Sequence, residues 1–387
     1  MTRHEANTDA NTDMEMDANT EAGTSQARKQ LAAAFGRDID PLKPYAVTFE
    51  ETDIDPFDVF VEEVLESKNL SSSTVERYHT YFDEWRMFMA EQGRYPACPN
   101  EGHVRTFIHH ELHEQGHKPR TVREKLQKLN RAYEYWQTDS ALPHPQEFNP
   151  FKLAREKVDL SRQTKKPPHN IPLTDLRERV QSIGHVRDRA YVVLPLKLGL
   201  RASELTNIQL QDVSLAHPDI RAHYPELGMH PRLEDRENAI YVPPSGEREG
   251  NKSELGRILP LDDESRRVLV KWLLIRPDNG LPWVFLTKQA HTKPEHDGVN
   301  DVWKVVFRPE YDETDEHRAV TSHFGRHFFS TYWRVKQDAP REVVKYMRGD
   351  KTDRAASNGR EAIDEYLHTF YDDVEQFYRE NVFKLDL

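Results

Sequence analysis

The sequence predicts a mainly α-helical protein with a small β-sheet, divided into two domains. Four segments in the first half repeat apolar residues at helical spacing, and two short apolar runs of strand type occur in the second half. A proline-rich stretch separates the halves, and 387 residues suffice for two domains with proper cores. We therefore expect residues 1–53 to form a disordered acidic tail and tether, 54–160 an N-terminal helical domain, 161–170 a linker, and 171–387 a second domain.

Composition excludes several classes of protein. No run of eighteen apolar residues and no basic-then-apolar leader is present, so we expect a soluble cytoplasmic protein rather than a membrane or secreted one. The single cysteine, Cys98, excludes an intrachain disulfide and a cysteine-based zinc cluster. The formal charge is −12, from 66 acidic and 54 basic residues. This balance argues superficially against a nucleic-acid partner, but a total says nothing about where the charges lie.

The N-terminal domain is predicted to be a small bundle of amphipathic helices. Pro56 suits a first helical turn, Ser73 with Glu76 forms a capping box, and Asn100 can cap a further helix. The expected helices cover residues 56–68, 73–92, 100–115 and 121–137. Four such helices in about a hundred residues are typical of a bundle.

Two groups of polar residues in this bundle have more than one interpretation. A basic row consists of Lys118, Arg120, Arg123, Lys125, Lys128 and Arg131. It is either a solvated helix face or a surface that contacts nucleic-acid phosphates, and the residues alone favour neither. Four histidines crowd the third helix: His109, His110, His113 and His117. Because no acidic or cysteine partner is convincingly placed beside them, we expect surface histidines rather than a metal site.

The second domain contains an arginine at a junction between helices. An apolar helix precedes Gly199, which permits a tight turn, and a short helix starts at Ser203. Arg201 lies between them, with Glu204 roughly one turn later. That spacing alone indicates an ion pair on a solvated surface.

Two motifs together change this interpretation. The string Gly199-Leu200-Arg201-x-Ser203-Glu204-Leu205 closely resembles the first arginine box of the tyrosine recombinase (phage-type integrase) family. The string His323-Phe324-Gly325-Arg326-His327 matches the family's His-x-x-Arg-His box, 122 residues after Arg201 (323 − 201). Thr321 or Ser322 can cap a helix here, so a phosphate near its start would meet free N–H groups, an imidazole and a guanidinium.

Between these motifs we expect a hairpin. Residues 239–242 and 257–261 read as short strands, joined by a polar loop that holds Lys252. A lysine in an exposed loop is usually just solvated. In the family, however, a lysine in this hairpin reaches the scissile position, and Lys252 lies five residues before Arg257, which matches that pattern.

The C-terminal part departs from the family pattern at one position. Asp350 stands where the family has a histidine or tryptophan, and aspartate cannot donate as imidazolium does. Tyr366 resembles the family's tyrosine, sixteen residues after Asp350 (366 − 350), with Tyr371 and Tyr378 as alternatives. A last helix over 372–385 has an apolar stripe that would be exposed if nothing covered it, and the resemblance implies that it docks on a neighbouring subunit.

The resemblance implies a site-specific DNA recombinase that needs neither metal, cofactor nor ATP. Its N-terminal domain would be the helical core-binding (SAM-like) domain that clamps double-stranded DNA, and its second domain the α+β catalytic domain. The DNA-binding residues would be Lys118, Arg120, Arg123, Lys125 and Lys128. Self-association as a dimer or tetramer on DNA is also implied.

The same resemblance assigns roles in one reaction. Tyr366 would form a 3′-phosphotyrosine, while Arg201 and Arg326 would clamp the two non-bridging oxygens. Lys252 would be the general acid, and His323 would orient Tyr366 or shuttle its proton. Glu204 and Asp350 would have supporting roles.

Three other interpretations stay open. A type IB topoisomerase shares this chemistry but relaxes supercoils. Asp350 and the long gap before Tyr366 favour a DNA-binding regulator with a weakened site. An acidic helical interaction protein would bind no duplex at all. The acidic composition also predicts a member from a halophilic archaeon, where molar salt shortens the screening length to about 3 Å.

Overall fold

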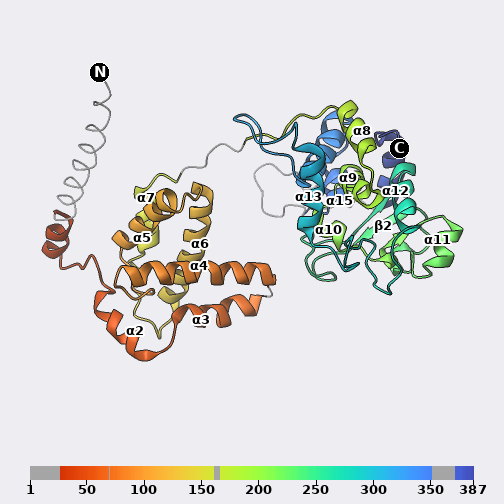
Figure 1. The fold of residues 1–387 in the computed structure, drawn as a ribbon. Helices are drawn as coiled ribbons and strands as arrows, with labels where there is room; N and C mark the ends of the chain where they lie inside the picture. Colours follow the sequence, from red (N-terminus) through yellow and green to blue (C-terminus); the bar gives the residue numbers. More distant parts are fainter. Residues whose placement is uncertain (1–26, 69, 161–165, 351–370) are drawn as a thin grey trace, which may run out of the picture. The chain divides into compact units, whose positions relative to one another are not determined.

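The computed structural model describes residues 27–68, 70–160, 166–350 and 371–387 (Figure 1). It divides into two compact units, Met1–Lys165 and Lys166–Leu387. Within the described ranges the units are mainly helical, and the C-terminal unit holds a three-stranded sheet, which confirms the predicted fold class. No helix in these ranges is both long and apolar enough to cross a membrane.

The N-terminal unit is a bundle whose helices follow the predicted segments. The expected helix over 56–68 is continuous through three labelled parts, and the one over 100–115 through two. The elements are η1 (Lys43–Tyr45), α2 (Ala46–Thr52), α3 (Pro56–Phe60), η2 (Val61–Leu65), η3 (Glu66–Lys68), α4 (Ser72–Glu91), α5 (Glu101–His109), η4 (His110–Glu114), α6 (Pro119–Thr138) and α7 (Pro150–Lys157). Aromatic side chains such as Phe82, Trp85 and Trp136 fill the core between them.

The expected tether over residues 1–53 is wrong for its last part. Leu42 is fully buried in the core of the N-terminal unit, and the ring of Phe49 stacks on Tyr95 with centroids 5.2 Å apart. Arg94 donates a hydrogen bond of 2.7 Å to Asp40. Leu42 and Phe49 are separated by two helical turns, a spacing that the surrounding acidic residues obscured. Residues 1–26 lie outside the described part.

A histidine is buried in this core. The His144 ring lies among the rings of Phe49, Tyr133 and Trp136, and its Nε2 is 2.8 Å from the carbonyl oxygen of Ala97. Burial lowers the pKa of His144 from 6.5 to about 4. The ring is therefore neutral at pH 7.

We expect the N-terminal unit to lose stability as the pH falls from about 6.5 towards 4. Because the pKa of His144 is lower in the folded chain, the unfolded chain binds a proton in this window and the folded chain does not. The contribution is complete above pH 6.5, and about 2 kcal/mol should be lost between pH 7 and pH 5. Urea unfolding at both pH values checks this. In His144→Gln the loss should shrink by this amount, and an unchanged loss would contradict the assignment.

The C-terminal unit places its sheet beside a helical core. Its helices are α8 (Leu173–Ser182), α9 (Val186–Leu198), α10 (Ala202–Thr206), η5 (Leu210–Asp212), α11 (Pro218–His223), η6 (Pro231–Leu233), α12 (Asp263–Leu273), α13 (His296–Phe307), α14 (His323–Thr331), η7 (Tyr332–Lys336), α15 (Arg341–Arg348) and α16 (Tyr371–Asn381). The strands β1 (Val213–Ser214), β2 (Ala239–Val242) and β3 (Arg257–Pro260) are antiparallel in the order β1-β2-β3. In register, Ile240 of β2 faces Val213 of β1 and Leu259 of β3.

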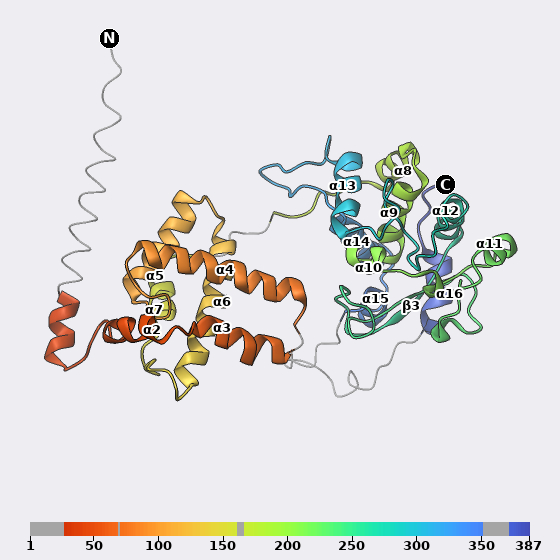
Figure 2. The same cartoon turned by 60° about the horizontal axis from the view of Figure 1, so that its bottom comes forward.

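Helix α9 is the centre of this unit. It packs against α12, α13 and α14 (Figure 2). All of its last nine residues, 190–198, are buried. Lys197 is fully buried on it, and its Nζ donates to Asp262 at 2.7 Å and Glu264 at 2.5 Å. The same ammonium donates to the carbonyl oxygen of Phe383 at 2.6 Å. A buried lysine thus ties the core helix to the C-terminal segment.

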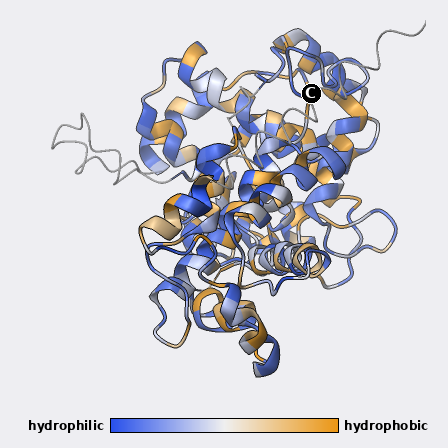
Figure 3. Cartoon of the chain, turned by 90° about the vertical axis from the view of Figure 1, so that its left-hand side faces the viewer, coloured by the Kyte–Doolittle hydropathy of each residue, from blue (hydrophilic) through white to orange (hydrophobic). Residues whose placement is uncertain are grey.

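The C-terminal segment packs on its own unit. The apolar stripe of the last helix, which the resemblance implies would dock on a neighbouring subunit, is covered by the unit itself: Val374 on α16 and Val382 and Phe383 after it belong to the core of the C-terminal unit. Glu264 accepts hydrogen bonds from the backbone N–H of Leu385 and Leu387. Helix α16 ends at Asn381, and the six residues after it form neither helix nor strand. Colouring by hydropathy shows apolar and polar residues interleaved along the helices (Figure 3).

Candidate functional site

A cluster of arginines and carboxylates joins four elements of the C-terminal unit. Within the described residues it is made of Arg201 before α10, Glu204 on α10, Arg257 at the start of β3, Arg326 on α14, Arg348 at the end of α15 and Asp350 just after it. The two motifs singled out in the sequence therefore meet in space. Arg257 and Arg348 join them without having been predicted.

Glu204 forms the floor of the cluster. Its side chain is inaccessible to solvent and accepts hydrogen bonds from Arg257 Nη2 and Arg201 Nη1, both at 2.9 Å. Ser253 Oγ donates to it at 2.7 Å. Burial alone would raise the pKa of Glu204, but the charge and hydrogen bonds of Arg257 outweigh it and lower the pKa to about 2. Glu204 is thus a buried counter-ion rather than the surface partner that its spacing indicates.

Arg326 is held from both sides. Its side chain is 2% exposed; Nη1 donates to the carbonyl oxygen of Gly199 at 2.7 Å, and Nη2 donates to Asp350 Oδ1 at 2.6 Å. Burial, then the neighbouring Arg201, lowers the pKa of Arg326 to about 9, so it stays cationic at neutral pH. Gly199 has φ 65°, and a Cβ there would lie 2.7 Å from the ring of Phe329. Glycine is required at this turn.

Asp350 lies across the mouth of the cluster. Its Oδ1 accepts from Arg326 and also from Arg201 Nη2 at 3.2 Å, and its Oδ2 is 2.9 Å from Arg348 Nε. The side chains of Arg201, Asp350 and Arg348 are 25%, 27% and 31% exposed, against 2% or less for the floor. Solvent therefore reaches the cluster on the side of Asp350.

His323 and Lys252 lie at the edge of this arrangement. His323 is the first residue of α14 and its ring is 4.6 Å from that of His327. Burial, then Arg326, lowers the pKa of His323. Lys252 is exposed in the loop between β2 and β3. Its neighbour Ser253 is buried and accepts a hydrogen bond from Arg201 at 2.9 Å, which fixes the loop one residue away from Lys252.

The predicted nucleophile, Tyr366, lies outside the described residues. The alternatives are both packed inside the C-terminal unit. Tyr378 is fully buried, its hydroxyl donates to the carbonyl oxygen of Lys197 at 2.9 Å, and burial raises its pKa well above 10. Tyr371 is 4% exposed and lies 4.3 Å below the guanidinium of Arg236, and burial raises its pKa too. Neither phenol reaches solvent.

The basic row of the N-terminal unit is divided by the structure. Lys118 and Arg120 are exposed at the start of α6, and Lys128 lies over the ring of Tyr78 at 4.3 Å. Arg123 donates to the carbonyl oxygen of Leu160. These four differ from Lys125, whose placement does not fit a DNA contact.

Lys125 is a correction to the predicted DNA-binding set. It is 2% exposed, and its Nζ is 2.5 Å from Glu111 and 2.7 Å from Glu84. The helical spacing showed that Lys125 shares a turn with other cations, but its partners come from other helices. Lys125 is therefore an internal counter-ion.

We expect Lys125→Ala to lower the free energy of unfolding by about 3 kcal/mol, because the buried carboxylate of Glu111 loses its ammonium partner and keeps only the His117 ring at 2.7 Å. Urea denaturation measures this. Lys118→Ala, at an exposed position on the same helix, is the matched control and should change stability by less than about 0.5 kcal/mol. Equal effects of the two substitutions would refute the buried pair.

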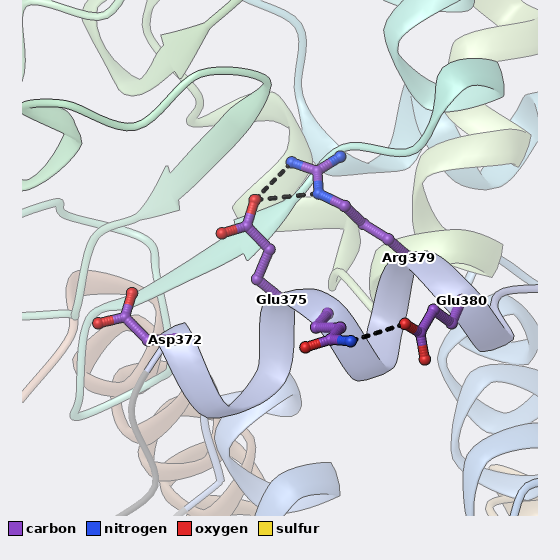
Figure 4. Close-up of a pocket in the computed structure, with 5 residues that line it drawn as sticks. Asp372, Glu375, Arg379 and Glu380 are labelled. Carbon is purple, nitrogen blue, oxygen red and sulfur yellow. Dashed lines mark hydrogen bonds and ion pairs between the residues drawn. The ribbon is translucent and has the colours of Figure 1, made fainter.

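Elsewhere in the described residues, the two other kinds of site to consider are a metal site and a polar hollow that could bind a ligand. Within the described residues, no group of histidine, cysteine and acidic side chains could hold a metal ion. A hollow on α16 is lined by acidic side chains, but Glu375 pairs with Arg379 and Gln376 with Glu380, each at 2.8 Å (Figure 4). Asp372 pairs with Arg236 at 2.8 Å. Its acidic side chains are thus already engaged by neighbours on α16 and by Arg236.

Sequence reasoning missed Arg257, Ser253 and Arg348. A signal existed for Arg257, because a cation beginning an otherwise apolar strand needs a buried counter-ion. Arg348 lies two residues before Asp350. Because Asp350 replaces the histidine or tryptophan of the family, a cation close to it was the available signal. Ser253 carried no signal, since a serine in a polar loop is common.

Comparisons with known proteins find relatives of this chain in one family. A model of the Phage integrase family matches residues 173–356, which contain the whole described cluster. Tyrosine recombinase XerC of Staphylococcus carnosus is 26% identical over 288 residues, 72% of this chain and 83% of that protein. XerC of Roseiflexus sp. and of Bacillus subtilis are 24% and 28% identical over 170 and 172 residues, and these matches span 43% of this chain and about half (53%) of each relative.

Solved structures share the fold. The Tn1549 transposon integrase in complex with transposon right end DNA has a TM-score of 0.53 at 15% identity, covering 83% of this chain and 97% of that one. A lambda integrase dimer bound to a COC′ core site has a TM-score of 0.56 at 12% identity, covering 88% and 89%. At these identities the likeness concerns the fold.

Proposed function

Because the chain belongs to the phage integrase family of tyrosine recombinases, we propose that it cuts and rejoins double-stranded DNA at specific sites through a 3′-phosphotyrosine. One observation carries the proposal: Arg201 and Arg326, from motifs far apart in the sequence, bind the same anionic oxygen. Two guanidinium forks directed at one anion suit the non-bridging oxygens of a phosphodiester. Glu204 of the buried floor accepts a hydrogen bond from Arg201 at 2.9 Å, and the carbonyl oxygen of Gly199 accepts one from Arg326 at 2.7 Å, so each guanidinium is held in place.

The proposed reaction needs few groups. The phenol oxygen of Tyr366 attacks phosphorus, and the bond from phosphorus to the 5′ oxygen breaks. Lys252 gives a proton to the leaving 5′ oxygen, and His323 accepts the phenol proton. The lowered pKa of His323 supports this role, because a neutral imidazole can take up a proton at pH 7. The phosphotyrosine keeps the energy of the cleaved bond, so a second DNA end reverses the step without ATP.

The partners follow from the same proposal. The chain would act on double-stranded DNA, with Lys118, Arg120, Arg123 and Lys128 of the N-terminal unit contacting phosphates. It would assemble as a dimer or tetramer, as lambda integrase does in a dimer bound to a core site and in a tetramer bound to a Holliday junction. The reaction would take place in the cytoplasm, whose reducing conditions suit the free and buried thiol of Cys98.

Covalent trapping tests the proposal. Nicked duplexes taken from the DNA that flanks the reading frame should form a protein–DNA adduct that survives denaturation. Tyr366→Phe should abolish the adduct, because phenylalanine has no nucleophilic oxygen. Tyr371→Phe is the matched control and should retain it. An adduct in Tyr366→Phe would overturn the assignment of the nucleophile.

The arrangement at Asp350 favours a second candidate, a DNA-binding regulator on the same fold. In that case the chain should bind duplex DNA with a steep salt dependence but give no adduct with any flanking duplex. If an adduct forms, synapsis of two duplexes separates a recombinase from a type IB topoisomerase, which would act on one duplex.

A further inference from the structure

The carboxylate of Asp350 is bound as an anionic ligand by three arginines. Its Oδ1 accepts from Arg326 at 2.6 Å and from Arg201 at 3.2 Å, and its Oδ2 pairs with Arg348 Nε at 2.9 Å. Both oxygens are therefore engaged. A carboxylate is a two-oxygen monoanion, and guanidinium groups bind it in the same geometry as two oxygens of a phosphate.

We propose that Asp350 occupies the phosphate site of the free chain, and that Arg348 is a third phosphate-binding arginine that faces the DNA phosphate once Asp350 leaves. This inference rests on the proposed function, because it takes the anion to be a DNA phosphodiester. In this arrangement Arg348 binds the DNA phosphate, and Asp350 acts as a competing anion rather than as a hydrogen-bond donor.

The chain around Gly349 places the two side chains on the same anion site. Gly349 has φ 64° and ends α15, so the backbone turns between Arg348 and Asp350. A Cβ on Gly349 would lie 2.5 Å from Arg257 Nη1, which shows how closely the turn approaches the buried floor. Arg257 Nε also donates to the carbonyl oxygen of Met347 at 2.8 Å, so the floor fixes the backbone next to Arg348.

Charge explains why the carboxylate and a phosphate exclude each other. Arg201, Arg257, Arg326 and Arg348 carry four positive charges, against two negative charges on Glu204 and Asp350. Without DNA, Asp350 reduces the repulsion among the arginines and accepts hydrogen bonds from Arg201 and Arg326. A phosphate entering beside Asp350 would bring two anions into contact, which is unfavourable at a partly buried site. Replacing the carboxylate by a phosphodiester, which is also a monoanion, leaves the net charge of the cluster unchanged.

The exchange also accounts for Asp350, which stands where the family has a histidine or tryptophan. Aspartate cannot donate to a phosphate, so position 350 supplies no cation to the reaction. Arg348, two residues earlier and 31% exposed at the mouth, supplies a planar donor that stays charged. A rotation about the side-chain torsions of Asp350 towards solvent suffices to open the site.

Binding of inorganic phosphate to the full chain tests this directly. Isothermal titration calorimetry at low chloride would compare the unmodified chain, Asp350→Asn, and Asp350→Asn combined with Arg348→Gln. Asp350→Asn should bind phosphate about tenfold more tightly, because the competing carboxylate is gone. Adding Arg348→Gln should weaken this binding about tenfold, because in the Asp350→Asn chain Arg348 no longer pairs with a carboxylate and contacts the phosphate instead.

Matched variants separate local effects from net charge. Asp372 and Arg236 form an exposed ion pair at 2.8 Å in the same unit, so Asp372→Asn and Arg236→Gln make the same charge changes elsewhere. They should shift phosphate affinity less than twofold. Should Arg348→Gln unfold, Arg348→Lys keeps the charge without the fork and should still bind phosphate more weakly than the arginine form.

Two results would overturn the inference. Asp350→Asn could bind phosphate no more tightly than the unmodified chain, or removal of Arg348 could leave the affinity of Asp350→Asn unchanged. The outcome is independent of covalent trapping, since no bond is cleaved. If the chain forms a covalent adduct but the variants bind phosphate as the unmodified chain does, only this inference is wrong. If the variants change phosphate affinity as expected but no adduct forms, the recombinase proposal is wrong and the anion site remains.

Discussion

Arg326→Lys is expected to lower the rate of covalent-adduct formation by about 10³-fold. Arg326 reaches Gly199 with one Nη and the shared anion oxygen with the other, and a lysine ammonium cannot span both positions. The charge is kept, so the loss measures the planar fork rather than the electrostatic attraction. Single-turnover cleavage of a nicked duplex gives the rate.

The control for this substitution is Arg236→Lys, which changes an arginine outside the cluster and should cleave at the unmodified rate. Circular dichroism and thermal unfolding must show that Arg326→Lys is folded, because the side chain is buried. A decrease of less than about tenfold would mean that Arg326 contributes only a positive charge, and the role in binding the phosphate oxygens would then be wrong.

Glu204→Ala is expected to destabilise the C-terminal unit by about 3–5 kcal/mol. The substitution removes the only acid that Arg257 contacts among the described residues, and the guanidinium of Arg257 would remain buried without a counter-ion. Urea unfolding measures the loss. Glu234→Ala, at an exposed position of the same unit, should change the free energy of unfolding by less than about 0.5 kcal/mol.

Acid titration gives this prediction a second readout. The pKa of Glu204 is about 2 in the folded chain and 4.5 as an ordinary value, so the unfolded chain binds a proton first as the pH falls. The stabilisation is complete above pH 4.5 and is lost as the pH approaches 2, by about 3 kcal/mol in total. Glu204→Gln should lack this part of the acid dependence. An unaltered acid dependence would show that Glu204 is not the titrating group.

Local pattern predicted the helices and the two motif arginines well. The amphipathic segments of the N-terminal bundle form where their periodicity places them, because burying an apolar stripe requires no distant information. Arg201 and Arg326 were grouped by motif, and the structure brings them to one carboxylate. Sequence reasoning reaches residues that belong to a strong local pattern, even where two such patterns lie far apart in the chain.

The errors concern charges whose partners arrive from elsewhere in the chain. Lys125 looked like a surface cation because its own helix shows only neighbouring cations, but its counter-ions are 41 (125 − 84) and 14 residues away. Arg257 was assigned to a strand, and its partner Glu204 lies 53 residues earlier. Burial of a charge depends on tertiary pairing, so periodicity does not predict it.

Lys197 has a consequence for the order of events during synthesis on the ribosome. Its partners Asp262 and Glu264 emerge 65 and 67 residues later, and the carbonyl of Phe383 only 186 residues later. Until then, the central helix carries an ammonium whose final ligands do not yet exist, and nascent chains fold domain by domain. The N-terminal bundle, whose core is complete by residue 160, is therefore ready to fold long before its C-terminal neighbour can close.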